Sequence, residues 1–437
     1  MIYESGNAIW TAEADGSGKR SLDHIPSANR FFARAFPSFS PNGEFIVYFQ
    51  QAVGPMGDYW VIPATGGSPH QLTHDLQWGG KPAWTPDGHN VIFPSKRGGT
   101  ITLWRVGMDG KNPEPVTTGL GQDAQPDVSA DGQRLIYTST RVEYFFMVTD
   151  PKTGKEEVLY RNRRAFYFPR VAPDGRSIAF FAEVEPREQI MLMHSDGHSL
   201  RQLTHYKSHE ANIMPRWWPD GQSIIYYQNL RPASLRRLPL DGGPSETLLM
   251  EFDWELNMDA EPSPSGDRLA FVRTDPLTRE RRVIIRRIET GDETQLDPAI
   301  THAPSWSADG SLLLGTGNDK VVVCPVTGSE CRVVVDASNE AQSGLGFGNG
   351  KYGREARWSS DQSHIFYSRD TDEPGYFSLW RVKFDGSGDQ QLFDFGPVHP
   401  LAHRFEVLPD DQILWGRYER SDSELVLAWI SQNPSEP

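Results

Sequence analysis

Residues 82–93 read PAWTPDGHNVIF, and variants of this phrase occur nine times along the chain. A copy has proline or alanine, a variable residue, a large apolar residue, a short turn built around Asp-Gly or a related pair, and then an alternating apolar strand. The copies begin near residues 37, 82, 126, 169, 215, 260, 304, 356 and 405. Such a period, roughly 45 residues, predicts a stack of similar supersecondary units.

The copy at residues 82–93 shows how one unit is expected to fold. Pro86 presets φ for the turn, Asp87 bonds the local backbone and Gly88 accepts a positive φ. Trp84, just before the turn, is predicted to wedge between neighbouring units. A third strand and a more polar fourth strand follow in residues 102–117. Four antiparallel strands per repeat is the pattern of a β-propeller blade.

We therefore predict an all-β fold with one domain over residues 1–437, a single β-propeller of eight or nine four-stranded antiparallel blades. The last repeat ends without a fourth strand, while residues 1–25 supply a partial blade. N-terminal strands are accordingly expected to complete the last blade, which removes exposed sheet edges. The Gly-rich residues 338–356 are expected to form an inserted loop.

Composition limits the class of protein. The 437 residues carry a formal net charge of −15, which argues against a nucleic-acid-binding role because that affinity comes from Lys and Arg. No apolar run approaches the roughly 20 residues that span a bilayer, and no signal peptide is visible. We expect a monomer that is cytoplasmic as written, or periplasmic or secreted if a leader has been removed. Cys324 and Cys331, the two cysteines, form either a disulfide or two thiols.

The phrase P-x-W-S-P-D-G-x-x-I-x-[YF], followed by LW-x-x-x-x-D-G and Q-L-T, resembles the TolB-like, WD-repeat-like β-propeller family. It is clearest at residues 82–93 with Leu103-Trp104, at 169–180 with Gln202-Leu203-Thr204, and at 356–367 with Leu379-Trp380. The resemblance implies a bacterial propeller that binds a partner in the cell envelope, senses a ligand, acts as a scaffold, or is attached to a peptidase. The best-known member has an exported leader and a separate N-terminal domain, and this chain shows neither.

Candidate site residues lie in the loops that join one unit to the next, because propeller loops converge at one end of the ring. Their imidazoles, carboxylates, arginines and tyrosine are the side chains that bind ligands or transfer protons. They are Arg163, Arg164, Tyr167, His205, His209, Glu210, Glu255, Asp259, His302, His399 and His403.

Two functions fit this sequence. The first is a non-catalytic protein-interaction or ligand-sensing propeller without a cofactor, which binds a protein, a peptide or a carbohydrate. The alternative is a metal-assisted lyase or hydrolase of acidic polysaccharides, for which His205, His209, His399 and His403 would hold a divalent metal. The chain has no Gly-x-Ser-x-Gly motif and no α/β-hydrolase segment, which excludes a complete prolyl-oligopeptidase-like enzyme.

Overall fold

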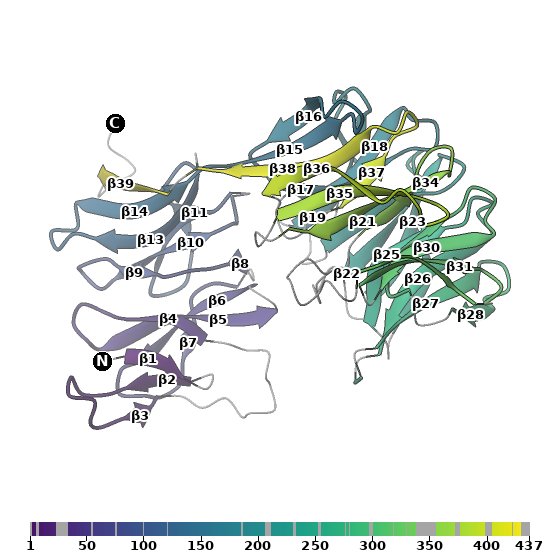
Figure 1. The fold of residues 1–437 in the computed structure, drawn as a ribbon. Helices are drawn as coiled ribbons and strands as arrows, with labels where there is room; N and C mark the ends of the chain where they lie inside the picture. The colour runs from purple at the N-terminus through teal and green to yellow at the C-terminus, as the bar shows by residue number, and fades with distance from the viewer. Residues whose placement is uncertain are drawn as a thin grey trace. The chain divides into compact units, whose positions relative to one another are not determined.

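The computed structural model of the chain describes β-strands joined by turns, and its described residues contain no helix (Figure 1). These residues are 2–5, 8–22, 34–53, 56–74, 77–98, 100–119, 121–184, 187–205, 211–229, 233–251, 255–275, 277–278, 280–296, 300–317, 319–328, 330–337, 355–371, 376–397, 404–421 and 423–429. The predicted all-β class is confirmed. The Gly-rich segment lies almost wholly outside the described residues.

The chain divides into two compact units. Unit 1 comprises Met1–Val142 and Arg420–Pro437, and unit 2 comprises Glu143–Glu419. The chain therefore leaves unit 1 once, builds unit 2 from one continuous segment, and returns to unit 1.

Unit 1 contains four antiparallel sheets among its described residues. The first consists of β1 (Ile2–Ser5), β2 (Ala8–Thr11) and β3 (Arg20–Ser21). The second consists of β4 (Arg34–Phe39), β5 (Phe45–Val53), β6 (Met56–Pro63) and β7 (His70–Gln71), with β8 (Gln77–Trp78) also paired to β6. The third has β9 (Ala83–Trp84), β10 (Asn90–Ser95), β11 (Thr102–Gly107) and β12 (Glu114–Pro115). The fourth, called the end sheet below, has the order β13 (Gln122–Val128), β14 (Arg134–Thr140) and β39 (Glu424–Trp429).

Unit 2 contains six four-stranded sheets in its described part. Five follow chain order: β17 (Phe166–Val171), β18 (Ser177–Val184), β19 (Arg187–His194), β20 (Arg201–Gln202); β21 (Ala211–Trp217), β22 (Ser223–Asn229), β23 (Ala233–Pro239), β24 (Glu246–Glu251); β25 (Glu255–Pro262), β26 (Arg268–Thr274), β27 (Arg281–Arg287), β28 (Glu293–Gln295); β29 (His302–Trp306), β30 (Leu312–Gly317), β31 (Lys320–Pro325), β32 (Arg332–Asp336); β33 (Ala356–Trp358), β34 (His364–Asp370), β35 (Tyr376–Lys383), β36 (Gln390–Pro397). The sixth, called the clasp sheet below, has the order β16 (Glu156–Asn162), β15 (Val142–Thr149), β38 (Ile413–Arg420) and β37 (Phe405–Val407).

The first strands of these six sheets lie next to one another in a cyclic order. Neighbouring contacts run from β17 to β21, β25, β29, β33 and β37, and β37 contacts β17 in turn. Each of these innermost strands opens one copy of the repeated phrase. The phrase therefore sets the inner surface of unit 2.

Strand pairing at the last repeat differs from the prediction. β1, β2 and β3 pair with each other, whereas β39 pairs with β14, and β37 and β38 join β15 and β16. The third and ninth repeats thus exchange strands. The physical reason is local: only Arg141 separates β14 from β15, which is too short for a hairpin reversal and contains no turn residue. β15 therefore continues into another sheet and leaves the place beside β14 to β39.

The turn of the repeat has the predicted chemistry. Asp87 Oδ1 accepts hydrogen bonds from Thr85 Oγ1 at 2.6 Å and from the His89 backbone at 2.9 Å, and Gly88 has φ +70°. The same position keeps a positive φ where it is not glycine, 58° at Gln362 and 63° at Asp411. Hydrogen bonding by the Asp side chain thus fixes the turn in copies that lack glycine.

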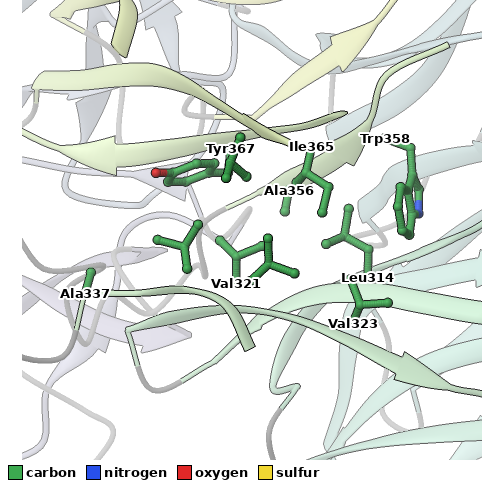
Figure 2. Close-up of a cluster of buried hydrophobic side chains, with 11 residues drawn as sticks. Leu314, Val321, Val323, Ala337, Ala356, Trp358, Ile365 and Tyr367 are labelled. Carbon is green, nitrogen blue, oxygen red and sulfur yellow. The ribbon is translucent and has the colours of Figure 1, made fainter. Parts of the chain in front are cut away.

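Tryptophans of the phrase join neighbouring sheets, as predicted. The indole Nε1 of Trp217 donates to the carbonyl of Arg170 at 2.8 Å, and Trp306 and Trp358 donate in the same way to Glu261 at 3.0 Å and Ser305 at 3.3 Å. Each acceptor is the variable residue of the preceding innermost strand. Figure 2 shows the packing that accompanies one such contact, with Trp358 and Ile365 of one sheet against Leu314 and Val323 of its neighbour.

Replacing Trp217 with phenylalanine is expected to lower the free energy of unfolding of unit 2 by about 1 to 3 kcal/mol, because the Arg170 carbonyl loses its buried donor. Hydrogen–deuterium exchange of peptides from β17 and β21 in a urea series would measure it. The matched control is Trp78→Phe, since Trp78 is exposed and belongs to unit 1. Equal protection of β17 and β21 in the wild type and the Trp217 variant would contradict this role.

Two further observations concern the cysteines and possible membrane-spanning helices. Cys324 and Cys331 are joined by a disulfide, with their Cα atoms 4.3 Å apart. The bridge connects the end of β31 to the residue before β32. In the described part of the chain, no helix has the length and apolar character needed to cross a membrane.

Candidate functional site

Seven charged side chains meet at the centre of unit 2, and we call them the central cluster. Four are arginines and three are glutamates, and they come from or directly precede five of the six innermost strands. They are Arg170, Arg216, Glu261, Glu355, Arg357, Arg404 and Glu406. The sixth strand, β29, contributes the small Ser305 at the corresponding position.

A bulge in the innermost strand precedes Arg170 and Arg216. In β17 the register shifts between Tyr167 and Arg170, and Phe168, which precedes Pro169, has φ 57°. β21 repeats this at Met214, φ 56°, before Arg216. Proline cannot donate to the strand ladder, and a bulge redirects the residue that follows it. In these two strands a proline and a bulge thus precede the residue that joins the cluster, whereas Glu261 and Arg357 follow alanine.

Ion pairs link these strands across the centre. Arg170 Nη2 lies 2.7 Å from Glu355 Oε1, and its Nη1 lies 2.8 Å from Glu406 Oε2. Arg357 also pairs with Glu355, and its guanidinium lies 3.8 Å from Glu406. The cluster thus connects β17 with β33 and β37, which lie far away in the sequence.

A second group of contacts completes the cluster. Glu261 Oε2 lies 3.2 Å from Arg216 Nε and 3.6 Å from Arg357 Nη1. The guanidinium of Arg404 stacks 5.0 Å above the ring of Phe168. Arg357 is therefore the central member, since it touches all three glutamates.

Burial and charge shift the proton equilibria of this cluster. Burial alone would raise the pKa of Glu355, but Arg170, Arg357, Arg404 and Arg216 outweigh it and lower that pKa to about 2. Burial, together with the neighbouring Arg170, lowers the pKa of Arg216 to about 9. The pKa of Glu406 is raised, mainly by burial. The cluster thus holds Glu355 ionised over the whole physiological range.

Low pH should weaken the interaction of Glu355 with the arginines of the cluster. Because the folded-state pKa of Glu355 lies below its ordinary value of 4.5, its stabilising contribution is full above about pH 4.5 and is lost as pH falls toward 2. We expect the stability difference between the wild type and Glu355→Gln to be small at pH 2 and to grow up to pH 4.5. Urea unfolding read by hydrogen exchange in unit 2 would measure it, and parallel pH curves for the two proteins would refute the coupling.

Two members of the cluster are partly exposed to solvent. The side chains of Glu261 and Glu406 are 24% and 20% exposed, whereas Arg170, Arg357 and Glu355 are 3%, 6% and 0% exposed. Glu355 Oε2 accepts no hydrogen bond from the described residues. Glu261 and Glu406 are therefore more accessible to solvent than Arg170, Arg357 and Glu355.

The residues predicted from the loops are placed unevenly. Arg163 and Arg164 are exposed between β16 and β17, and Arg163 lies 3.8 Å from Glu143. Tyr167 is buried on β17, where its ring packs 5.8 Å from Tyr144 and burial raises its pKa. His205 is exposed beyond β20, and the Nδ1 of His302, at the start of β29, lies 2.8 Å from Thr301 Oγ1.

The other predicted residues cannot be placed to the same extent. Glu255 and Asp259 lie in β25, but their side chains are outside the described set. His209, Glu210, His399 and His403 lie outside the described residues altogether. No group of three or more His, Cys, Asp or Glu side chains that could hold a metal ion occurs among the described residues. The predicted mouth site therefore stays a prediction.

The sequence reasoning missed the central cluster because five of its seven members occupy the variable slot of the phrase. In unit 2 that slot holds Arg170, Arg216, Glu261, Ser305, Arg357 and Glu406. Charged residues between Pro and Trp on an otherwise apolar strand were the available signal. Glu355 and Arg404 precede two of these slots by two residues and share their side of the strand.

Unit 1 contains a small cavity of about 170 Å³ beside the end sheet. It is lined by Thr117, Thr118, Gly119, Asp123, Tyr137, Ser139, Arg141, Glu424 and Val426. Asp123 is buried there and accepts a hydrogen bond from Ser139 at 2.7 Å. None of the residues predicted from the loops lines this cavity.

Comparison with known proteins finds similarity over part of the chain. Residues 19–208 match the family model of the TolB beta propeller domain. An uncharacterized protein of Agrobacterium fabrum is 29% identical over 182 residues, which cover 37% of this chain and 62% of that protein. An uncharacterized peptidase of Bacillus subtilis, YuxL, is 26% identical over 200 residues, which cover 44% of this chain and 26% of the peptidase. The matches thus span less than two thirds of either relative.

Among solved structures, a putative TolB from Agrobacterium tumefaciens aligns with a TM-score of 0.49 and 18% identity, and the alignment covers 64% of this chain and 99% of that one. The nine copies of the phrase, the antiparallel sheets that they open and the family match over residues 19–208 together support a TolB-like β-propeller.

Proposed function

We propose that this chain is a non-catalytic interaction or ligand-sensing β-propeller, and that its partner binds at the centre of unit 2. The observation that supports the proposal is the central cluster, in which five innermost strands bring charged side chains to one place. Glu261 and Glu406, which are 24% and 20% exposed, are the members that we propose the partner contacts. Charged groups held in a rigid scaffold give a surface that discriminates between partners.

The arrangement of the sheets supports the same reading. We infer that the six sheets of unit 2 act as one closed propeller, in which the clasp sheet joins the first and last segments of the unit. The cyclic contacts of the innermost strands agree with this closure. A closed ring would hold the central cluster fixed, because its members belong to different sheets.

The partner is proposed to be a protein or peptide, with a carbohydrate as the other ligand class. The metal-assisted lyase or hydrolase remains the second candidate. Its four histidines include His205, which is exposed, and three that lie outside the described residues. No contact of the described residues favours it over the first proposal.

Capture from cell extract by the immobilised full chain would test the interaction. We expect a specific partner that the double variant Glu261→Gln/Glu406→Gln retains at least about tenfold less well, since the amides keep the shape and remove the charge. Glu246→Gln is the matched control, because Glu246 is 60% exposed at the outer strand β24. Equal capture by the double variant, or turnover of an acidic polysaccharide with no partner found, would overturn the proposal.

A further inference from the structure

The end sheet of unit 1 leaves large apolar side chains in solvent. On β39, Leu425, Leu427 and Trp429 are 70%, 64% and 76% exposed. They alternate along the strand, so they share one face of the sheet. Ile136 of β14 pairs directly with Leu427 and therefore lies on the same face.

The opposite face of the same sheet is covered. Leu135 of β14 is buried and packs with Ile92 and Leu103 of the third sheet, and Tyr137 packs against this cluster. Inside the molecule, then, the apolar face of one sheet is closed by the face of another sheet. The uncovered face has the character of a surface that a further β-sheet would cover.

Two charged side chains beside this face indicate which sheet would cover it. Asp127 of β13 pairs with Ile136, and Arg134 of β14 pairs with Trp429, so both lie on the uncovered side. Both are exposed, and the ion pair of Arg134 with Asp131, at 3.9 Å, is open to solvent. Both charges lie next to Ile136, and one acid beside one base can pair with the same two residues of a second copy across a twofold axis.

We propose that this face, which consists of Asp127, Arg134, Ile136, Leu425, Leu427 and Trp429, is a dimer interface that packs against the same face of a second copy of the chain. In the twofold arrangement Arg134 of each copy meets Asp127 of the other, and the apolar side chains fill the centre. The three β39 side chains expose apolar surface on the order of 400 Å², which is below the ~800 Å² per partner of a standard interface. We therefore expect a weak dimer. It is an alternative to the monomer predicted from the sequence, and it does not depend on the function proposed for unit 2.

Sedimentation velocity of the full chain from about 1 to 100 µM would measure the association. Leu427→Lys is expected to weaken it more than about tenfold, because each dimer then buries two uncompensated charges. Leu277→Lys is the matched control, since Leu277 is 91% exposed in unit 2. Far-ultraviolet circular dichroism of each variant confirms that the fold is kept.

A charge swap tests the twofold arrangement itself. Arg134→Asp and Asp127→Arg should each weaken the dimer, and the double variant should restore it. A chain that is monomeric at 100 µM, a dimer that Leu427→Lys leaves unchanged, or a double swap that fails to restore association would overturn the proposal.

Discussion

Replacing Arg170 with methionine is expected to lower the free energy of unfolding of unit 2 by about 3 to 5 kcal/mol. The Arg170 side chain is 3% exposed and pairs with Glu355, which is 0% exposed, and with Glu406. Its removal leaves a buried carboxylate with less compensation, which costs more than the pair itself contributes. Urea unfolding, followed by hydrogen exchange in the innermost strands, would measure the loss separately from unit 1.

Two comparisons isolate the cause. Arg163→Met removes an arginine whose side chain is 55% exposed and 3.8 Å from Glu143, and its expected cost is below about 1 kcal/mol. The double variant Arg170→Met/Glu355→Met removes both charges and should lose less than the sum of the single changes. Additive losses would show that Arg170 does not act through Glu355.

Replacing Trp415 with alanine is expected to cost about 3 to 5 kcal/mol and to release the clasp sheet first. Trp415 of β38 is 1% exposed, and its ring centroid lies 5.0 Å from that of Phe395. Its Nε1 donates a hydrogen bond to Thr149 Oγ1 of β15 at 2.8 Å. The change therefore opens a large cavity and leaves the buried Thr149 hydroxyl without its donor. Hydrogen exchange should rise in β37 and β38 before it rises in β25 or β29.

Trp429→Ala is the control for the tryptophan change. Trp429 is 76% exposed, and in dilute protein its replacement is expected to change stability by no more than about 0.5 kcal/mol. Uniform exchange across all sheets of unit 2 in the Trp415 variant would contradict a local role in the clasp.

The local structure of the repeat could be predicted because local physics decides it. The turn around Asp87 and Gly88 depends on residues that are adjacent in the chain, and it forms as expected. The inter-sheet position of Trp217 follows from the same phrase, since a large ring before the turn has only the neighbouring sheet to pack against. Each of these features recurs in several copies of the phrase, so several copies predict it independently.

Partner choice between distant strands could not be predicted in this way. The alternating pattern of β38 would suit any antiparallel neighbour, and nothing in it specifies β15. One local signal did exist: the sequence from Ser139 to Val142 has no Gly, Pro, Asn or Asp with which to reverse the chain. The central cluster was missed for a related reason, because residues such as Arg170 and Glu355 acquire a role only when distant strands meet.

The exchange of strands between the third and ninth repeats has a kinetic consequence. If β39 paired with β14 before unit 2 folded, it would close an unfolded loop over residues 143–419 and carry the loop-closure entropy of that segment. A folded unit 2 brings its own two ends together through β15 and β38 and so shortens the effective loop to a few residues. The end sheet of unit 1 should therefore be the last to acquire protected amides during refolding, and its rate should follow the completion of unit 2.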